Sequence, residues 1–211
     1  MAKQKNEFKC SECGWTTVKW AGRCGECQAW GSLDETSGTT KEVRAIKLNE
    51  SQAARPITEI ETGESQSQPT MVGEFDRVLG GGLVPGAAIL LSGEPGVGKS
   101  TLLTRVAGNL ATTESVVLYV SGEESVHQIK LRASRLDAEH ERLLLASETD
   151  VAAIAMDIRA TKPVAVIIDS IQTMQSSSVE SAPGTVSQVR AATSGIAQIA
   201  RELQVPVFIV G

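Results

Sequence analysis

The fold is decided by the stretch Ala87-Ala-Ile-Leu-Leu-Ser-Gly-Glu-Pro-Gly-Val-Gly-Lys-Ser100. Its first part, residues 87–92, is apolar and predicts a buried strand. Its second part, residues 93–100, fits the pattern G-x-x-x-x-G-K-[ST], a loop whose backbone N–H groups surround phosphates. The amphipathic stretch 99–111 predicts a helix directly behind the loop. A strand, this loop and a helix in that order indicate a site for a nucleoside triphosphate.

The individual residues of this loop suit separate tasks. The glycines let the backbone N–H groups turn inward, and the helix adds the positive end of its dipole. We expect Lys99 to reach the β- and γ-phosphates and Ser100 to place a hydroxyl on Mg²⁺. A chance glycine turn is the alternative, which the flanking strand and helix oppose. The nucleotide contacts that we expect are Gly93, Glu94, Pro95, Gly96, Val97, Gly98, Lys99, Ser100 and Thr101.

Two further carboxylates follow apolar runs and should meet the loop at one edge of a parallel sheet. Residues 164–168 predict a strand that ends at Asp169, which we expect to hold the Mg²⁺ hydration shell. An Asp that caps a turn is the alternative. The segment 120–124 reads Val-Ser-Gly-Glu-Glu. We expect Glu123 to orient and deprotonate the attacking water and to be catalytic together with Lys99. The alternative is that Glu123 and Glu124 are two solvated acidic residues at the start of a helix.

All four cysteines form two Cys-x-x-Cys pairs, Cys10/Cys13 and Cys24/Cys27. Two such knuckles supply the four soft ligands of a tetrahedral, structural Zn²⁺. Disulfides are one alternative, which the lack of a secretory signal opposes, and a redox Cys-x-x-Cys would need only one pair. We therefore expect one zinc ion bound by all four cysteines.

Three tryptophans, Trp15, Trp20 and Trp30, lie in the same short segment. A module of this size does not fold without its metal, so we expect the indoles to form its small core. Stacking on DNA bases is the alternative.

The chain divides into three expected parts: a four-cysteine zinc module at 1–35, a flexible linker at 36–69 and a nucleotide-binding core at 70–211. The linker is rich in Ser, Thr, Gln and Glu and has no sustained apolar period. In the core, apolar runs alternate with amphipathic stretches, which predicts a parallel sheet with helices on both faces. Beyond the first strand and helix, we expect strands at 116–121, 143–146, 164–168 and 205–210 and helices at 126–135, 151–161 and 185–204.

Composition narrows the possible partners and location. The 211 residues are 41% hydrophobic and carry a net charge of −5, so charge alone does not indicate a nucleic-acid binder. The longest apolar runs are far too short to span a membrane, and the N-terminus does not resemble a secretory signal. We expect a cytoplasmic protein with no membrane contact.

The segment 70–86, which leads into the loop, resembles the entry segment of the RecA/KaiC class of ATPases. Together with the paired cysteines, it is similar to a bacterial DNA-repair family of RecA-like ATPases. Residues 119–125, 168–173 and 182–190 also resemble that family. The resemblance implies a RecA-like P-loop parallel sheet preceded by a zinc-ribbon-like module, with ATP, Mg²⁺ and structural Zn²⁺ as cofactors. It assigns the roles given above to Lys99, Ser100, Asp169 and Glu123.

The resemblance also implies a function. It indicates a DNA-dependent ATP hydrolase of recombinational DNA repair that processes branched intermediates. The implied partners are single-stranded or branched DNA, a RecA-type recombinase and identical subunits in a hexameric ring, with a DNA-facing loop at about 174–185. Family members continue past this point, so we expect an N-terminal fragment with a C-terminally truncated core. Their sensor and trans-acting residues would lie beyond Gly211.

Two other functions stay open at this stage. One is a KaiC-like, ATP-driven switch or scaffold that does not act on DNA, which the cysteine module disfavours. The other is a small-molecule kinase, which the Gly-Glu-Glu segment at 122–124 and the lack of an evident lid weaken. ATP turnover measured with and without single-stranded DNA separates these functions.

Overall fold

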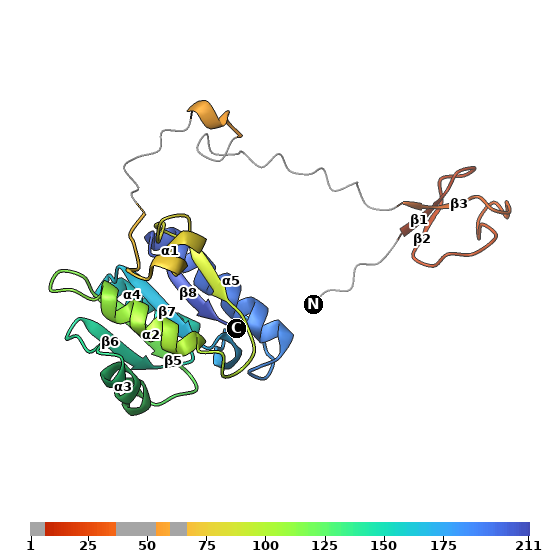
Figure 1. Ribbon diagram of the computed structural model, residues 1–211. Coiled ribbons are helices and arrows are strands. Elements are labelled where there is room, and N and C mark those ends of the chain that lie inside the picture. The colour runs from red at the N-terminus through yellow and green to blue at the C-terminus, as the bar shows by residue number, and fades with distance from the viewer. Residues whose placement is uncertain (1–6, 37–53, 60–66) are drawn as a thin grey trace. The chain divides into compact units, whose positions relative to one another are not determined.

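The computed structural model describes residues 7–36, 54–59 and 67–211 of the chain (Figure 1). The chain divides into two compact units, Met1–Glu61 and Thr62–Gly211, and each is described by itself. Most of the predicted linker, at 37–53 and 60–66, lies outside the described residues. The domain boundaries and the flexibility of the linker therefore stay predictions. Within the linker, Ile57–Glu59 forms a single 3-10 turn, η2.

The first unit holds a small antiparallel sheet of order β2-β1-β3. Its strands are β1 (Glu7–Cys10), β2 (Thr16–Thr17) and β3 (Leu33–Thr36). The buried centre beside this sheet consists of Cys10, Cys24 and Leu33, with Phe8 packed against them. So small an apolar centre cannot hold the unit together by burial alone, which makes a bound metal the expected source of stability.

The expectation that the tryptophans form this core is wrong. The exposed fraction is 37% for Trp15, 66% for Trp20 and 78% for Trp30, and the Arg23 guanidinium lies 5.7 Å from the centre of a Trp30 ring. The two cysteine knuckles converge on the centre of the unit, and among the described residues the apolar side chains beside them are those of Leu33 and Phe8. The larger indoles are therefore left outside.

The second unit is built on a five-stranded parallel sheet of order β4-β8-β7-β5-β6 (Figure 1). Each strand is a short apolar run, and the three central strands are buried on both faces, as expected for a parallel sheet. The strands are β4 (Ala88–Leu91), β5 (Val117–Ser121), β6 (Leu143–Ser147), β7 (Ala165–Asp169) and β8 (Val207–Val210).

Helices cover both faces of this sheet, which confirms the predicted architecture. One face packs against α2 (Lys99–Leu110) and α3 (Val126–Arg135), in a cluster that includes Tyr119 and Phe208. Phe208 also stacks on Phe75 of the short helix α1 (Gly73–Val78), which the sequence did not predict. The other face packs against α4 (Val151–Thr161) and α5 (Val186–Leu203).

Side-chain caps fix the starts of three helices. Ser125 and Gln128 form the predicted capping box of α3. Asp150 accepts a hydrogen bond from the Ala152 backbone N–H at the start of α4, and Thr185 accepts one from Gln188 at the start of α5. Within the described ranges, every helix is too short or too polar to cross a membrane.

Candidate functional site

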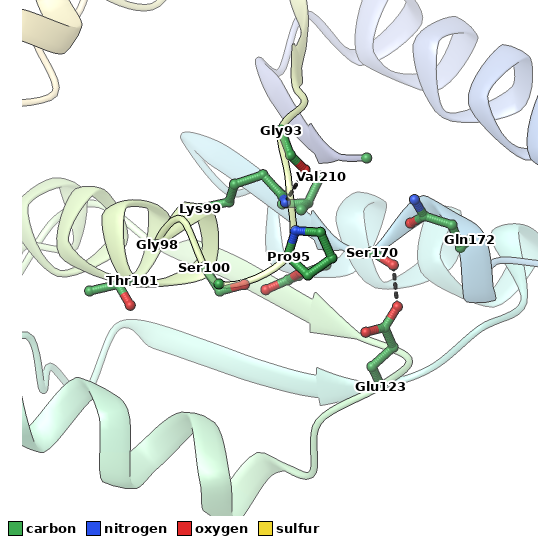
Figure 2. A pocket seen from close by; sticks show the side chains of 13 residues that line it. Gly93, Pro95, Gly98, Lys99, Ser100, Thr101, Glu123, Ser170, Gln172 and Val210 are labelled. Carbon is green, nitrogen blue, oxygen red and sulfur yellow. Dashed lines mark hydrogen bonds between the residues drawn. The ribbon is translucent and has the colours of Figure 1, made fainter.

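The phosphate loop and both predicted carboxylates line one cavity at the carboxyl edge of the sheet (Figure 2). The loop follows β4, Glu123 follows β5, and Asp169 ends β7. The cavity has a volume of about 510 Å³, within the range of small-molecule sites. It is lined by Gly93, Pro95, Gly96, Gly98, Lys99, Ser100, Thr101, Glu123, Asp169, Ser170, Gln172, Val210 and Gly211. Glu94 and Val97, which we also expected to contact the nucleotide, are not among the described residues that line the cavity.

The loop has the backbone shape that an anion site needs. Gly96 and Gly98 have φ angles of 85° and 95°, which side chains rarely tolerate. A Cβ at either position would meet open space among the described residues, so the dihedral angle is the reason for glycine there. Helix α2 begins at Lys99, behind a glycine that has no side chain to cap it. The first N–H groups of this helix therefore face the cavity as donors for an anion.

Lys99 lies across the loop that it follows. Its ammonium donates to the backbone oxygen of Gly93 at 2.7 Å (Figure 2). It also donates to the backbone oxygen of Glu94 at 3.1 Å. Both acceptors are neutral carbonyls, so an incoming phosphate would offer the ammonium a stronger, charge-assisted hydrogen bond. The arrangement holds the charge beside the cavity before any ligand arrives.

The neighbouring carboxylates of Glu123 and Glu124 lie in different environments. Glu123 lines the cavity and accepts a hydrogen bond from the Ser170 hydroxyl, which points toward it (Figure 2). Glu124 instead pairs with Arg132, with 2.6 Å between the carboxylate oxygen and the guanidinium nitrogen. Glu123 is therefore the carboxylate of this pair that can meet a water molecule at the cavity.

Asp169 is buried at the end of β7, and one of its oxygens already has a partner. The Tyr119 hydroxyl donates to Oδ2 of Asp169 at 2.6 Å. Burial, followed by the charge of Asp169, raises the pKa of Tyr119, so this phenol stays a protonated donor. Among the described residues, the hydrogen bond occupies Oδ2 and leaves Oδ1 of Asp169 as the acceptor available to a ligand of the cavity.

Sequence reasoning missed several residues of this region. Ser170, Gln172, Val210 and Gly211 line the cavity, and Tyr119 and Arg132 lie behind it. Ser170 and Gln172 directly follow the predicted metal carboxylate, so their place in the chain was a usable signal. For Tyr119, the signal was a hydroxyl in an otherwise aliphatic strand, because a buried phenol normally finds a hydrogen-bond partner.

The cysteines come together as the spacing predicted. All four Sγ atoms lie within 4.8 Å of one another, with 3.7 Å between Cys10 and Cys27 and 3.6 Å between Cys13 and Cys24. Four ligands in a tetrahedron with Zn–S bonds of about 2.3 Å would be separated by about 3.8 Å. All four are free thiols rather than disulfides. The donor set thus fits one closed, structural Zn²⁺ site.

The thiols of this cluster affect one another's ionisation. The hydrogen bond with the Ser32 hydroxyl lowers the pKa of Cys10 to about 6. The Ala29 backbone N–H favours the Cys27 thiolate, but desolvation and the three neighbouring cysteines together raise the pKa of Cys27 to about 12. A divalent cation at the centre would stabilise all four thiolates, because it supplies opposite charge between them.

The chain belongs to the AAA domain family, whose profile matches residues 63–211. A second family, described as rubredoxin metal binding domain, matches residues 8–35. The whole chain is 44% identical to DNA repair protein RadA of Bacillus subtilis and 42% identical to DNA repair protein RadA of Mycobacterium tuberculosis. These matches confirm the DNA-repair family that the motifs resembled. The chain covers 47% and 45% of those two proteins, so it spans about half the length of these relatives.

A solved structure supports the fold independently. It is titled as a DnaB-like replicative helicase and its interactions with primase. It matches 70% of this chain and 43% of its own, with a TM-score of 0.56 at 21% sequence identity. At this identity the likeness concerns the fold alone, and it agrees with the predicted RecA-like sheet.

Proposed function

We propose that this chain binds ATP with Mg²⁺ in the cavity and is the nucleotide-hydrolysing part of a DNA-dependent ATPase of recombinational DNA repair. The observation that carries the proposal is the convergence of the phosphate loop, Asp169 and Glu123 on one cavity. The similarity to RadA proteins supports the repair context. The proposed reaction processes branched recombination intermediates.

The residues divide the chemistry among them. The loop N–H groups and Lys99 bind the phosphates and stabilise the charge that develops on them. Ser100 and Asp169 hold the Mg²⁺, which supplies charge neutralisation on the phosphate oxygens. Glu123 orients a water molecule and accepts its proton, and the Ser170 hydroxyl steadies that carboxylate.

The DNA-facing part of the proposal rests on the loop after β7. Gln188 of α5 is buried and binds this loop through four hydrogen bonds: it accepts from the Ser176 N–H and donates to the carbonyls of Ser176, Val179 and Ser181. The loop thereby has a defined shape and belongs to the same unit as the cavity. Single-stranded or branched DNA, a RecA-type recombinase and identical subunits in a hexameric ring are the proposed partners.

Binding of a fluorescent ATP analogue, and then ATP turnover with and without single-stranded DNA, test the proposal. Lys99→Ala should weaken binding and lower turnover by about 10²–10³-fold, the range seen when one donor to a developing charge is removed. Lys130→Ala is the matched control, since Lys130 is exposed on α3, away from the residues that line the cavity, and forms an ion pair with Glu139. Equal affinity and turnover in a folded Lys99→Ala variant would refute the nucleotide site. Turnover that ignores DNA would instead support the KaiC-like switch.

A further inference from the structure

A buried polar chain lies directly behind the cavity. Tyr119 on β5 is fully buried on the sheet face that packs against α2 and α3. Its register partner on β7 is Ile167, two residues before Asp169, so both side chains of the Tyr119–Asp169 pair emerge on the same face of the sheet. The phenol thereby reaches Oδ2 of Asp169 at 2.6 Å, while Asp169 itself lines the cavity.

Arg132 of α3 connects this phenol to two other elements. One terminal nitrogen donates to the Tyr119 hydroxyl at 3.2 Å, and the other donates to Glu124 at 2.9 Å. Its Nε donates to the Thr104 hydroxyl on α2 at 3.0 Å. The Arg132 side chain is only 15% exposed, so these hydrogen bonds are largely shielded from water.

The chain of hydrogen bonds ends at the other residue expected to hold the metal. The Thr104 hydroxyl donates to the backbone oxygen of Ser100 at 2.7 Å. One network therefore touches both Asp169, at the end of β7, and Ser100, at the start of α2. These two residues come from different elements, and Arg132 links them indirectly, through Thr104 on α2 and through Tyr119, which donates to Asp169.

We propose that Tyr119 and Arg132 are positioning residues that orient the Asp169 carboxylate toward the Mg²⁺ of the bound nucleotide. The inference deepens the proposed function and rests on it. Neither residue lines the cavity, so each acts through Asp169. A carboxylate with one oxygen bound by a phenol has one orientation instead of two, and its free oxygen is the one presented to the cavity.

A purely structural role would not need this chemistry. The side chains that share the buried cluster of Tyr119, such as Val117, Ile167 and Phe208, are apolar, so a Phe side chain would suit the same surroundings. The hydroxyl adds a polar group that must be satisfied in the core. Its proton goes to Asp169 and its lone pair goes to Arg132, so both of its hydrogen bonds belong to the network that touches Asp169 and Ser100.

The test uses Tyr119→Phe, which removes only the hydroxyl. Affinity for a fluorescent ATP analogue is measured first in EDTA and then across a Mg²⁺ titration. We expect the affinity for the ATP analogue to be unchanged without the metal. The Mg²⁺ concentration needed for the metal-dependent increase in that affinity should rise roughly tenfold, as for other groups that orient metal ligands. Thr193→Val is the control, because it removes a hydroxyl-to-carbonyl hydrogen bond within α5, on the other face of the sheet.

Arg132→Lys provides a second route if Tyr119→Phe fails to fold. It keeps the positive charge but cannot reach Tyr119, Glu124 and Thr104 together, so the Mg²⁺ requirement should rise in the same direction. A Mg²⁺ titration identical to that of the unchanged chain, in either folded variant, overturns the positioning role and leaves the proposed function standing. An unchanged chain that binds no ATP analogue at any Mg²⁺ concentration overturns the proposed function, and the positioning role with it.

Discussion

Gly108, inside helix α2, provides a sharp test of the packing described above. In an open helix, Gly→Ala stabilises by about 1 kcal/mol, because alanine loses less backbone entropy on folding. At Gly108, however, the new Cβ would lie 2.5 Å from the Cβ and 2.7 Å from the Cα of Ala138, in the turn after α3. Neither neighbouring atom is the end of a flexible side chain, so the backbone of one element must move.

Overpacking costs about 1–3 kcal/mol, and contacts under 3.0 Å with backbone atoms place this case in the upper half of that range, which exceeds the helix gain. We expect Gly108→Ala to lower the free energy of unfolding by roughly 1–2 kcal/mol, or the Tm by roughly 2–8 °C for a unit of this size. Urea unfolding followed by circular dichroism measures it. Gly195→Ala in α5 is the matched control, since its Cβ would meet only the Val151 side chain, at 3.2 Å. A Gly108→Ala variant as stable as the unchanged chain would refute the reasoning.

Three further predictions follow from other parts of the structure. Metal analysis should give about one zinc per chain, and Cys24→Ser should lose the metal and unfold the first unit; a folded, metal-free unit would contradict this. Hydrogen bonds from the Thr70 hydroxyl and N–H lower the pKa of Asp76. The resulting stability is present above the unfolded pKa, near 3.9, and is lost as the pH falls through the lowered folded value. The free energy of unfolding of Asp76→Asn, measured with urea from pH 7 to 2, should therefore fall less steeply toward low pH than that of the unchanged chain. Gln188→Ala should speed hydrogen exchange at the Ser176 amide, with unchanged exchange as the contrary result.

Local signals predicted the core of the second unit well. The Ser125 and Gln128 pair placed the start of α3, because a capping box satisfies helix N–H groups with side chains that are visible in sequence. Helix α1 was missed, since it lies in a glycine-rich segment and depends on tertiary packing of Phe75 against Phe208. Its signal is long-range and is not contained in any short window of sequence.

The site shows the same division. The phosphate loop could be predicted because its glycines, lysine and serine lie within eight consecutive residues, 93–100. The different environments of Glu123 and Glu124 could not be predicted. They depend on contacts with Ser170, which belongs to another part of the chain, and with Arg132, which lies two turns into the next helix. The prediction for the tryptophans was wrong because residue type indicates a preference for burial but does not say which side chains fit inside a very small unit.

The strand order has a consequence for how the chain folds. Among the described strands, β4 pairs only with β8, more than one hundred residues later in the chain. Closing so long a segment is slow compared with forming the β5–β6 pair. Pulse-labelled hydrogen exchange should therefore protect the β5 amides before those of β4, and simultaneous protection would contradict this order. On a ribosome, the strand that carries the phosphate loop is synthesised early but can pair with β8 only after residues 207–210 have emerged, so a bound nucleotide can stabilise this part of the sheet only from that point on.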